Sequence, residues 1–376
     1  MAQSEDLIGI FEIAEMAGVT RAAVANWRNR FRDFPEPAAE LRSGPVFHRA
    51  QVRRWLGKRR GGVARVIALT NLKRGVGTTT TAVGLAEVLA GDFRKKVLVI
   101  DLDPQCDTSL RLLGPERWRK VHDKGRTVAR VIEDALDRSA RKPIKPESLI
   151  VRGASPVADA RSLDLLPSTL DLDDVLRRWE RTPAGPDYRI EPTAVLARAL
   201  AGVIDEYEYV IVDLPPDLGL LALNGLRLAT GFVVPVSPDE MSSFGVGRIA
   251  RGVGTFSAEI GETIRPLGLL QVRVGEGDPL PSKRRRRWRK DPIGWLETVV
   301  PEHGEPIPAP RKEPFDTCQE RYGDGDLYQA ILNLAEELRT DLEPTSKQEE
   351  PPEEPPEEPP GDDDAGADEV LEHGDD

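Results

Sequence analysis

From Val63 onward, six short and almost wholly apolar runs alternate with segments that have the spacing of amphipathic helices. Strands that alternate with helices form a mostly parallel sheet with helices on both faces, and strands buried on both faces need no polar alternation. The sequence therefore predicts an α/β fold with a doubly wound sheet. The expected strands are Val63–Thr70, Val97–Asp101, Leu163–Pro167, Tyr209–Asp213, Gly231–Val236 and Leu267–Val274, and the expected helices include Thr79–Ala90, Pro192–Glu206, Leu220–Leu228 and a last helix, Asp326–Leu338.

The charges divide the 376 residues into a body and an acidic tail. Asp and Glu number 64 against 52 Lys and Arg, so the formal net charge is −12. Residues 341–376 hold sixteen of the acids and one lysine, which gives them −15 and leaves +3 for the rest. The tail repeats Glu, Pro and Asp with few apolar residues, a composition typical of disorder. We therefore expect three parts: residues 1–62, residues 63–340 and a disordered tail, 341–376.

Several classes of protein are excluded by what the sequence lacks. There is no run of about 18 apolar residues that could form a transmembrane helix. The first residues are acidic, unlike those of a secretory signal. Two cysteines, Cys106 and Cys318, and four histidines are too few for a disulfide framework or a zinc site. We expect a soluble, cytoplasmic protein that does not bind a membrane.

The first 62 residues have the pattern of a helix-turn-helix. A short helix over Phe11–Gly18 ends in glycine, and Thr20 is a suitable N-cap for a second helix, Arg21–Arg30. A β-hairpin over Leu41–Phe47 and a further helix, Ala50–Leu56, follow. Arginine and asparagine can read guanine and adenine edges in the major groove. The residues expected to contact DNA here are Thr20, Arg21, Asn26, Arg28 and Arg30.

This segment resembles the winged helix of the MerR/excisionase type over about fifty residues. The resemblance implies site-specific DNA binding through the second helix. Two alternatives stay open: a helical oligomerisation module whose arginines are only solvated, and a helix-turn-helix that binds a protein.

A glycine-containing loop follows the first strand of the body. Val66–Thr70 leads into Asn71-Leu-Lys-Arg-Gly-Val-Gly-Thr-Thr-Thr80, and a helix begins near Thr79. Backbone N–H groups and the helix dipole converge on an anion in this arrangement. An ordinary phosphate loop reads GxxxxGK[ST], but Thr78 stands here where that pattern has lysine. The predicted nucleotide-binding residues are Arg74, Gly75, Val76, Gly77, Thr78, Thr79 and Thr80.

Two more motifs follow strands in the same order along the chain. Val97-Leu-Val-Ile-Asp-Leu-Asp-Pro-Gln105 ends in acids, and Tyr209-Val-Ile-Val-Asp-Leu-Pro-Pro216 has the form of a Walker B strand. With the loop, these motifs resemble the ParA/MinD family of deviant-Walker NTPases, over roughly residues 63–340. The resemblance weakens at residues 275–295, where an insertion stands in place of the usual nucleotide-base region. It implies a P-loop NTPase that binds ATP and Mg²⁺.

The resemblance also implies roles for single residues. Lys73 matches the signature lysine, which in the family reaches the partner's phosphates across a homodimer. Asp103 matches the residue that orients or activates the attacking water. Thr79, Asp101 and Asp213 match the magnesium region. Arg74 replaces a family glycine, and Thr78 replaces the lysine that contacts the phosphates, so hydrolysis, as opposed to binding, stays an open question.

A dense basic run lies at Ser282-Lys-Arg-Arg-Arg-Arg-Trp-Arg-Lys290. Such a run attracts phosphate backbones without sequence specificity. The alternatives are a solvated loop and a partner for the acidic tail. The arginines expected to contact DNA are Arg284, Arg285, Arg286, Arg287 and Arg289.

Two functions are consistent with these features. The first is a ParA-like DNA-partition protein, in which an ATP-dependent dimer binds DNA and a ParB-like partner stimulates release. Such a protein would be associated with the nucleoid, with possible autorepression through residues 1–62. The alternative is a transcriptional regulator or DNA-binding scaffold on a degenerate, non-hydrolysing NTPase domain.

Overall fold

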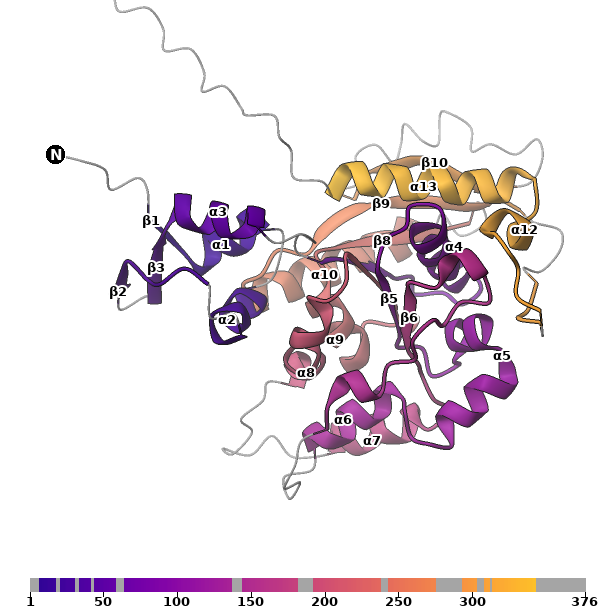
Figure 1. Cartoon of the computed structure of the whole chain (residues 1–376), viewed down its shortest axis with the longest axis horizontal. Helices are drawn as coiled ribbons and strands as arrows, with labels where there is room; N and C mark the ends of the chain where they lie inside the picture. The colour runs from indigo at the N-terminus through magenta and orange to yellow at the C-terminus, as the bar shows by residue number, and fades with distance from the viewer. Residues whose placement is uncertain are drawn as a thin grey trace, which may run out of the picture. The chain divides into compact units, whose positions relative to one another are not determined.

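The computed structural model describes residues 7–17, 21–30, 34–41, 44–58, 64–136, 144–181, 192–237, 243–274, 293–302, 308–311 and 313–342. Within these ranges, seven parallel strands form one sheet in the order β10-β9-β8-β4-β7-β5-β6 (Figure 1). The α/β class with a parallel sheet is thereby confirmed. The strands are β4 Arg65–Leu69, β5 Val97–Asp101, β6 Leu163–Leu166, β7 Tyr209–Asp213, β8 Gly231–Val236, β9 Arg265–Val274 and β10 Trp295–Pro301. Strands β4 to β9 correspond to the six expected strands, whereas β10 was not predicted.

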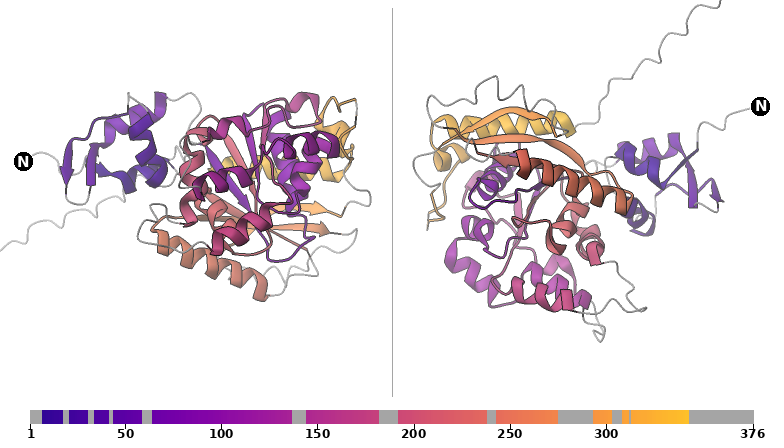
Figure 2. Two further views of the ribbon diagram at one scale, coloured as in Figure 1. Left: turned by 90° about the horizontal axis from the view of Figure 1, so that it is seen from below. Right: turned by 180° about the vertical axis from the view of Figure 1, so that it is seen from behind.

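Alternate residues of the central strands face two separate helical layers. On β4, Val66 and Ala68 belong to one buried cluster, and Ile67 and Leu69 belong to the other. The first cluster is completed by α6 to α10 and the second by α4, α5, α12 and α13. Both layers can be followed in Figure 1, where α13 lies along α4, and in Figure 2. The helices are α4 Thr78–Gly91, α5 Asp107–His122, α6 Val128–Leu136, α7 Leu172–Arg181, α8 Val195–Ile204, α9 Leu220–Leu228, α10 Ser243–Ile260, α12 Cys318–Tyr322 and α13 Asp326–Leu342.

The N-terminal residues form three helices and a small antiparallel sheet. The sheet has the order β1-β3-β2, so that β2 and β3 make the expected hairpin. An aromatic cluster fills its core, with Phe34 packed edge-on against Phe47 and Trp55. The elements are β1 Leu7–Gly9, α1 Ile10–Ala17, α2 Arg21–Arg30, β2 Ala39–Leu41, β3 Gly44–His48 and α3 Arg49–Lys58. The expected helices and hairpin are present, β1 was not predicted, and a DNA-binding helix-turn-helix stays a prediction.

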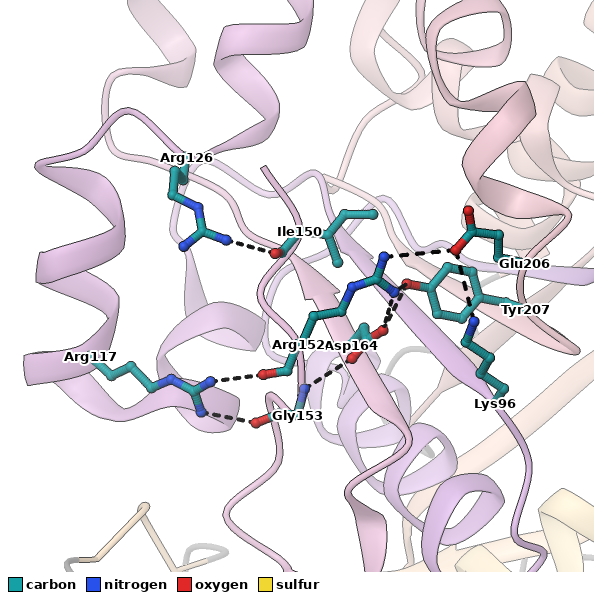
Figure 3. A network of polar contacts seen from close by, with 9 residues as sticks. All are labelled: Lys96, Arg117, Arg126, Ile150, Arg152, Gly153, Asp164, Glu206 and Tyr207. Carbon is teal, nitrogen blue, oxygen red and sulfur yellow. Dashed lines mark hydrogen bonds and ion pairs between the residues drawn. The ribbon is translucent and has the colours of Figure 1, made fainter. Parts of the chain in front are cut away.

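A polar network surrounds Asp164 on the edge strand β6 (Figure 3). The buried Asp164 carboxylate accepts hydrogen bonds from Arg152 at 2.7 Å, from the Tyr207 hydroxyl at 2.8 Å and from the Gly153 amide at 2.9 Å. Arg117 and Arg126 donate to backbone carbonyls of the same loop. The Asp164 contacts lie near the start of β6 and before β7, so they stabilise the fold and leave the carboxyl ends of the central strands open to a ligand.

No helix among the described residues is long and apolar enough to cross a membrane.

Candidate nucleotide-binding site

The loop between β4 and α4 is held in shape by its own backbone and by Asn71. The Asn71 side chain accepts a hydrogen bond from the Lys73 amide at 2.9 Å and donates to the Pro235 carbonyl at 2.6 Å. Gly75 and Gly77 have φ of +79° and +88°, which glycine adopts readily and other residues rarely do. Gly77 is the N-cap of α4, so the unpaired N–H groups of the first turn face the loop. The loop therefore has the backbone of an anion-binding turn.

Two carboxylates lie side by side where β5 and β7 end. Asp101 and Asp213 are paired across the sheet. The Asp213 Oδ2 atom accepts hydrogen bonds from the Thr108 hydroxyl at 2.6 Å and the Thr79 hydroxyl at 3.1 Å. The loop helix α4, the following helix α5 and strand β7 thus meet at one carboxylate oxygen.

Asp101 is held by a different set of donors. Its Oδ2 atom accepts from the Ser109 amide and hydroxyl at 2.8 and 2.6 Å, and its Oδ1 atom from the Asp103 amide at 3.1 Å. Asp101 is fully buried and is not among the described residues that line the cavity beside the loop. In this geometry Asp101 positions the segment that carries Asp103 and the start of α5.

Burial raises the pKa of three acids at the site, Asp101, Asp103 and Asp213. Burial raises the pKa of Asp213 to about 7, against the opposing effect of its hydrogen bonds from Thr108 and Thr79. Burial raises the pKa of Asp101 well above its ordinary value, and the nearby Asp213 charge adds to the effect. Burial also raises the pKa of Asp103, although Arg74 acts in the opposite direction. A cation bound here would favour the ionised carboxylates and reverse these shifts.

The donor atoms suit Mg²⁺ better than a softer metal. The Thr79 hydroxyl and the Asp213 carboxylate are in contact at the end of the loop, and Mg²⁺ is usually held by one or two such groups together with phosphate oxygens. Among the described residues, no group of three or more His, Cys, Asp or Glu side chains could hold a metal by itself. The site therefore fits a magnesium ion that arrives with a phosphorylated ligand.

A cavity of about 340 Å³ opens beside the loop. Of the predicted site residues, it is lined by Lys73, Arg74, Gly75, Gly77, Thr78, Thr79, Thr80, Asp103 and Asp213. Val76 is buried and lies outside that lining. The charged lining residues are four basic ones, Lys73, Arg74, Arg111 and Arg273, and four acidic ones, Asp103, Asp107, Asp213 and Glu302. Thr108, Arg111, Arg273 and Glu302 were not predicted from the sequence.

The residues expected to contact DNA are only partly described. Arg21 donates to the Ile260 carbonyl at 3.0 Å, and Arg28 lies 3.4 Å from Glu40 and over the Phe47 ring. The structure describes only the backbone of Asn26 and Arg30, within α2. Thr20 and the run that contains Arg284, Arg285, Arg286, Arg287 and Arg289 lie outside the described residues, as does most of the insertion expected at residues 275–295.

Comparison with known proteins agrees with this geometry. The AAA domain family AAA_31 matches residues 64–265, which include the loop, both acidic strand ends and most of the sheet. The chain belongs to this family.

Among its sequence relatives, an uncharacterized protein of Mycobacterium tuberculosis is 30% identical over 214 residues, 56% of this chain and 59% of the relative. The sporulation initiation inhibitor protein Soj of Bacillus subtilis is 28% identical over 259 residues, 65% of this chain and 90% of Soj. The chromosome partitioning protein ParA of Myxococcus xanthus is 30% identical over 210 residues, 55% of this chain and 64% of that protein. The AAA_31 match and these relatives place the chain in the ParA family. The chain spans 59% of the length of the mycobacterial relative.

Solved structures show the same fold. Cobyrinic acid a,c-diamide synthase from Mycobacterium smegmatis, with an ATP analog and magnesium bound, matches with a TM-score of 0.56 at 24% identity, covering 75% of this chain and 96% of that one. A putative plasmid partition protein from Borrelia burgdorferi bound to AMPPNP matches with a TM-score of 0.52 at 17% identity, covering 74% and 99%. Nucleotide and magnesium are thus bound in proteins that share this fold.

Proposed function

We propose that this ParA-family chain is a DNA-partition protein whose ATP-dependent homodimer binds DNA. The observation that carries the proposal is the meeting of the Thr79 and Thr108 hydroxyls on the buried Asp213 carboxylate, directly beside the glycine loop. A hydroxyl at the start of the loop helix and an acid at the end of the neighbouring strand are the groups that hold Mg²⁺ in P-loop NTPases.

The loop backbone supplies the phosphate contacts in this proposal. The N–H groups of residues 75–80 and the positive end of the α4 dipole bind the phosphate oxygens. Thr79 ligates the metal, Asp213 orients Thr79, and Asp101 fixes the backbone that carries Asp103. A bound Mg²⁺ would neutralise negative charge on the transferring phosphate.

Two residues have the proposed catalytic roles. The Asp103 carboxylate lies in the cavity, where it orients the attacking water. The Lys73 side chain is exposed at the rim, where it reaches the phosphates of the partner subunit in a dimer.

The proposed partners are DNA and a ParB-like protein. Residues 1–62 read a specific site through Arg21, Asn26 and Arg30, with Thr20 and Arg28 beside them, and so allow autorepression. The run from Arg284 to Arg289 binds DNA without sequence preference and keeps the protein on the nucleoid, in the cytoplasm.

A second candidate function rests on the residue at position 78. Threonine removes a cation on which phosphoryl transfer depends in other P-loop proteins. The second candidate is therefore a transcriptional regulator or DNA-binding scaffold that binds nucleotide weakly and does not hydrolyse it.

Titration calorimetry of the full chain with ATP and Mg²⁺ tests the proposal. The wild-type protein should bind ATP. Asp213→Asn should have a lower affinity for ATP than wild type when Mg²⁺ is present, and nearly the same affinity when Mg²⁺ is absent. ATP, compared with ADP, should also increase DNA binding and molecular mass. Nucleotide-independent DNA binding by a protein that binds no ATP would support the scaffold instead.

A further inference from the structure

The phosphate loop lacks its own lysine, yet four basic side chains line the cavity: Lys73, Arg74, Arg111 and Arg273. Phosphate oxygens carry negative charge that Mg²⁺ and the loop N–H groups offset only in part. A nucleotide site without the loop lysine therefore needs a cation from elsewhere in the chain.

Arg273 contacts the loop itself. Its Nη1 atom donates to the Gly75 carbonyl oxygen at 3.2 Å, across 198 positions of sequence. The preceding residue, Val272, also borders the loop, since a Cβ atom built at Gly77 would lie 3.5 Å from the Val272 side chain. The carboxyl end of β9 is thus packed against the two glycines of the loop.

The backbone at Arg273 is turned out of the strand conformation. Its φ is +59°, in the left-handed region that non-glycine residues rarely occupy. Such a conformation costs free energy and is retained where the surrounding structure enforces it, frequently at functional sites. The turn occurs at the residue whose guanidinium is directed at Gly75.

The other arginines of the cavity have different contacts. The Arg74 guanidinium lies 3.7 Å from Asp103 Oδ1 and is more than half exposed. Arg111 lies on α5, and its carbonyl oxygen accepts a hydrogen bond from Arg321. Arg273 is paired with Glu302 at 3.6 Å, and both side chains are more than half exposed. Arg273 can therefore exchange Glu302 for a phosphate without the cost of uncovering a buried charge.

We propose that Arg273 supplies, from the end of β9, the positive charge that Thr78 does not, and that its guanidinium binds the nucleotide phosphates. This inference rests on the proposed nucleotide site. A planar guanidinium can donate two parallel hydrogen bonds to phosphate oxygens, which a lysine ammonium cannot do. The phosphate-binding charge is thereby moved from the loop after β4 to the end of β9, two strands away in the sheet.

Calorimetric titration of the full chain with ATP, ADP and AMP, each with Mg²⁺, tests the inference in four proteins. These are wild type, Arg273→Gln, Thr78→Lys and the double variant. Arg273→Gln should weaken ATP binding by about tenfold to a hundredfold, the range of a charge-assisted hydrogen bond, and leave AMP binding nearly unchanged. Thr78→Lys should restore the lost affinity in the Arg273→Gln protein and add little to wild type.

The control is Arg265→Gln, which removes an arginine from the first residue of the same strand, outside the cavity lining. It should bind ATP like wild type. If Arg273→Gln binds ATP as tightly as wild type, or if Thr78→Lys adds the same factor in both backgrounds, the inference is wrong while the nucleotide site stands. If neither wild type nor Thr78→Lys binds ATP, the proposed function itself is wrong and the inference fails with it.

Discussion

At the scale of single residues, Gly77 makes the turn from strand to helix possible. It has a left-handed conformation, φ +88° and ψ 12°, and its carbonyl accepts the first hydrogen bond of α4 from the Thr81 amide. A side chain at this position would meet Val272 at an ordinary contact distance of 3.5 Å. The requirement for glycine therefore comes from the backbone and not from a lack of space.

Gly77→Ala should lower the free energy of unfolding by about 1–2 kcal/mol, the cost of the left-handed conformation for a residue with a Cβ atom. Urea denaturation measures the change. Gly254→Ala is the matched control, since Gly254 lies within α10 with no heavy atom within 4 Å of a built Cβ. The control should stabilise the protein by about 0.5–1 kcal/mol, because alanine favours a helix. Equal stability for both variants would contradict this account of the loop.

The single residues that could be predicted are those in sequence motifs at the carboxyl ends of strands. Thr79, in the first turn of α4, and Asp213, the last residue of β7, were both assigned to the magnesium region by the resemblance, and a 3.1 Å hydrogen bond joins them. Thr108 and Arg273 gave no such signal. Thr108 reaches Asp213 only because α5 begins beside it, and Arg273 reaches the loop only through the order of strands in the sheet.

At the scale of elements, α13 attaches the edge strand β10 to the body. The Glu337 carboxylate accepts hydrogen bonds from the Glu297 amide at 2.6 Å and from the Thr298 amide and hydroxyl at 3.0 and 2.7 Å. Three donors at the sheet edge are thus satisfied by one side chain of α13, and an unpaired edge is a site of aggregation.

Glu337→Ala should lower the free energy of unfolding by about 1–3 kcal/mol, because partly buried donors lose their acceptor. Glu336→Ala, at the exposed neighbouring position on α13, should change it by less than about 0.5 kcal/mol. Thermal unfolding of both variants, monitored by circular dichroism, gives the comparison. Similar values for the two would mean that packing alone holds β10 in place.

Elements were predicted well where burial is continuous and poorly where it alternates. Strands β4 to β9 consist mostly of apolar runs, which the sequence shows directly. Residues of β10 alternate between buried and more exposed positions, as expected of an edge strand, and its sequence, Trp-Leu-Glu-Thr-Val-Val-Pro, has no continuous apolar run. Helix α5 contains Gly114 and Pro115, and both residue types disfavour a continuous helix. Gly114 has non-helical backbone angles, so the helix is kinked there.

At the scale of the whole molecule, the proposed dimer depends on Lys73, whose exposed side chain lines the cavity. In the proposed arrangement, Lys73 reaches the phosphates bound by the partner subunit. Lys73→Ala should abolish the mass increase that ATP and Mg²⁺ produce in light scattering, while circular dichroism shows an unchanged fold. Lys124→Ala, at an exposed position after α5, should dimerise like wild type. Equal masses for Lys73→Ala and wild type with ATP would exclude this dimer.

The charge distribution along the chain also predicts two separable modes of DNA binding. Replacing Arg284–Arg287 with alanine should weaken binding to all duplexes alike, and should reduce the slope of log affinity against log salt by about 0.9 per lost phosphate contact. Arg21→Ala should instead lower affinity for one preferred duplex, since a bidentate base contact contributes about 1–3 kcal/mol. Fluorescence anisotropy over a series of salt concentrations measures both effects. The control for lost charge is the double variant Arg119→Ala and Lys120→Ala, which removes two exposed cations from α5.

If Arg21→Ala weakens binding to every duplex equally, Arg21 contacts phosphate and does not read bases. If the salt slope is unchanged without the four arginines, the basic run is an ordinary solvated loop.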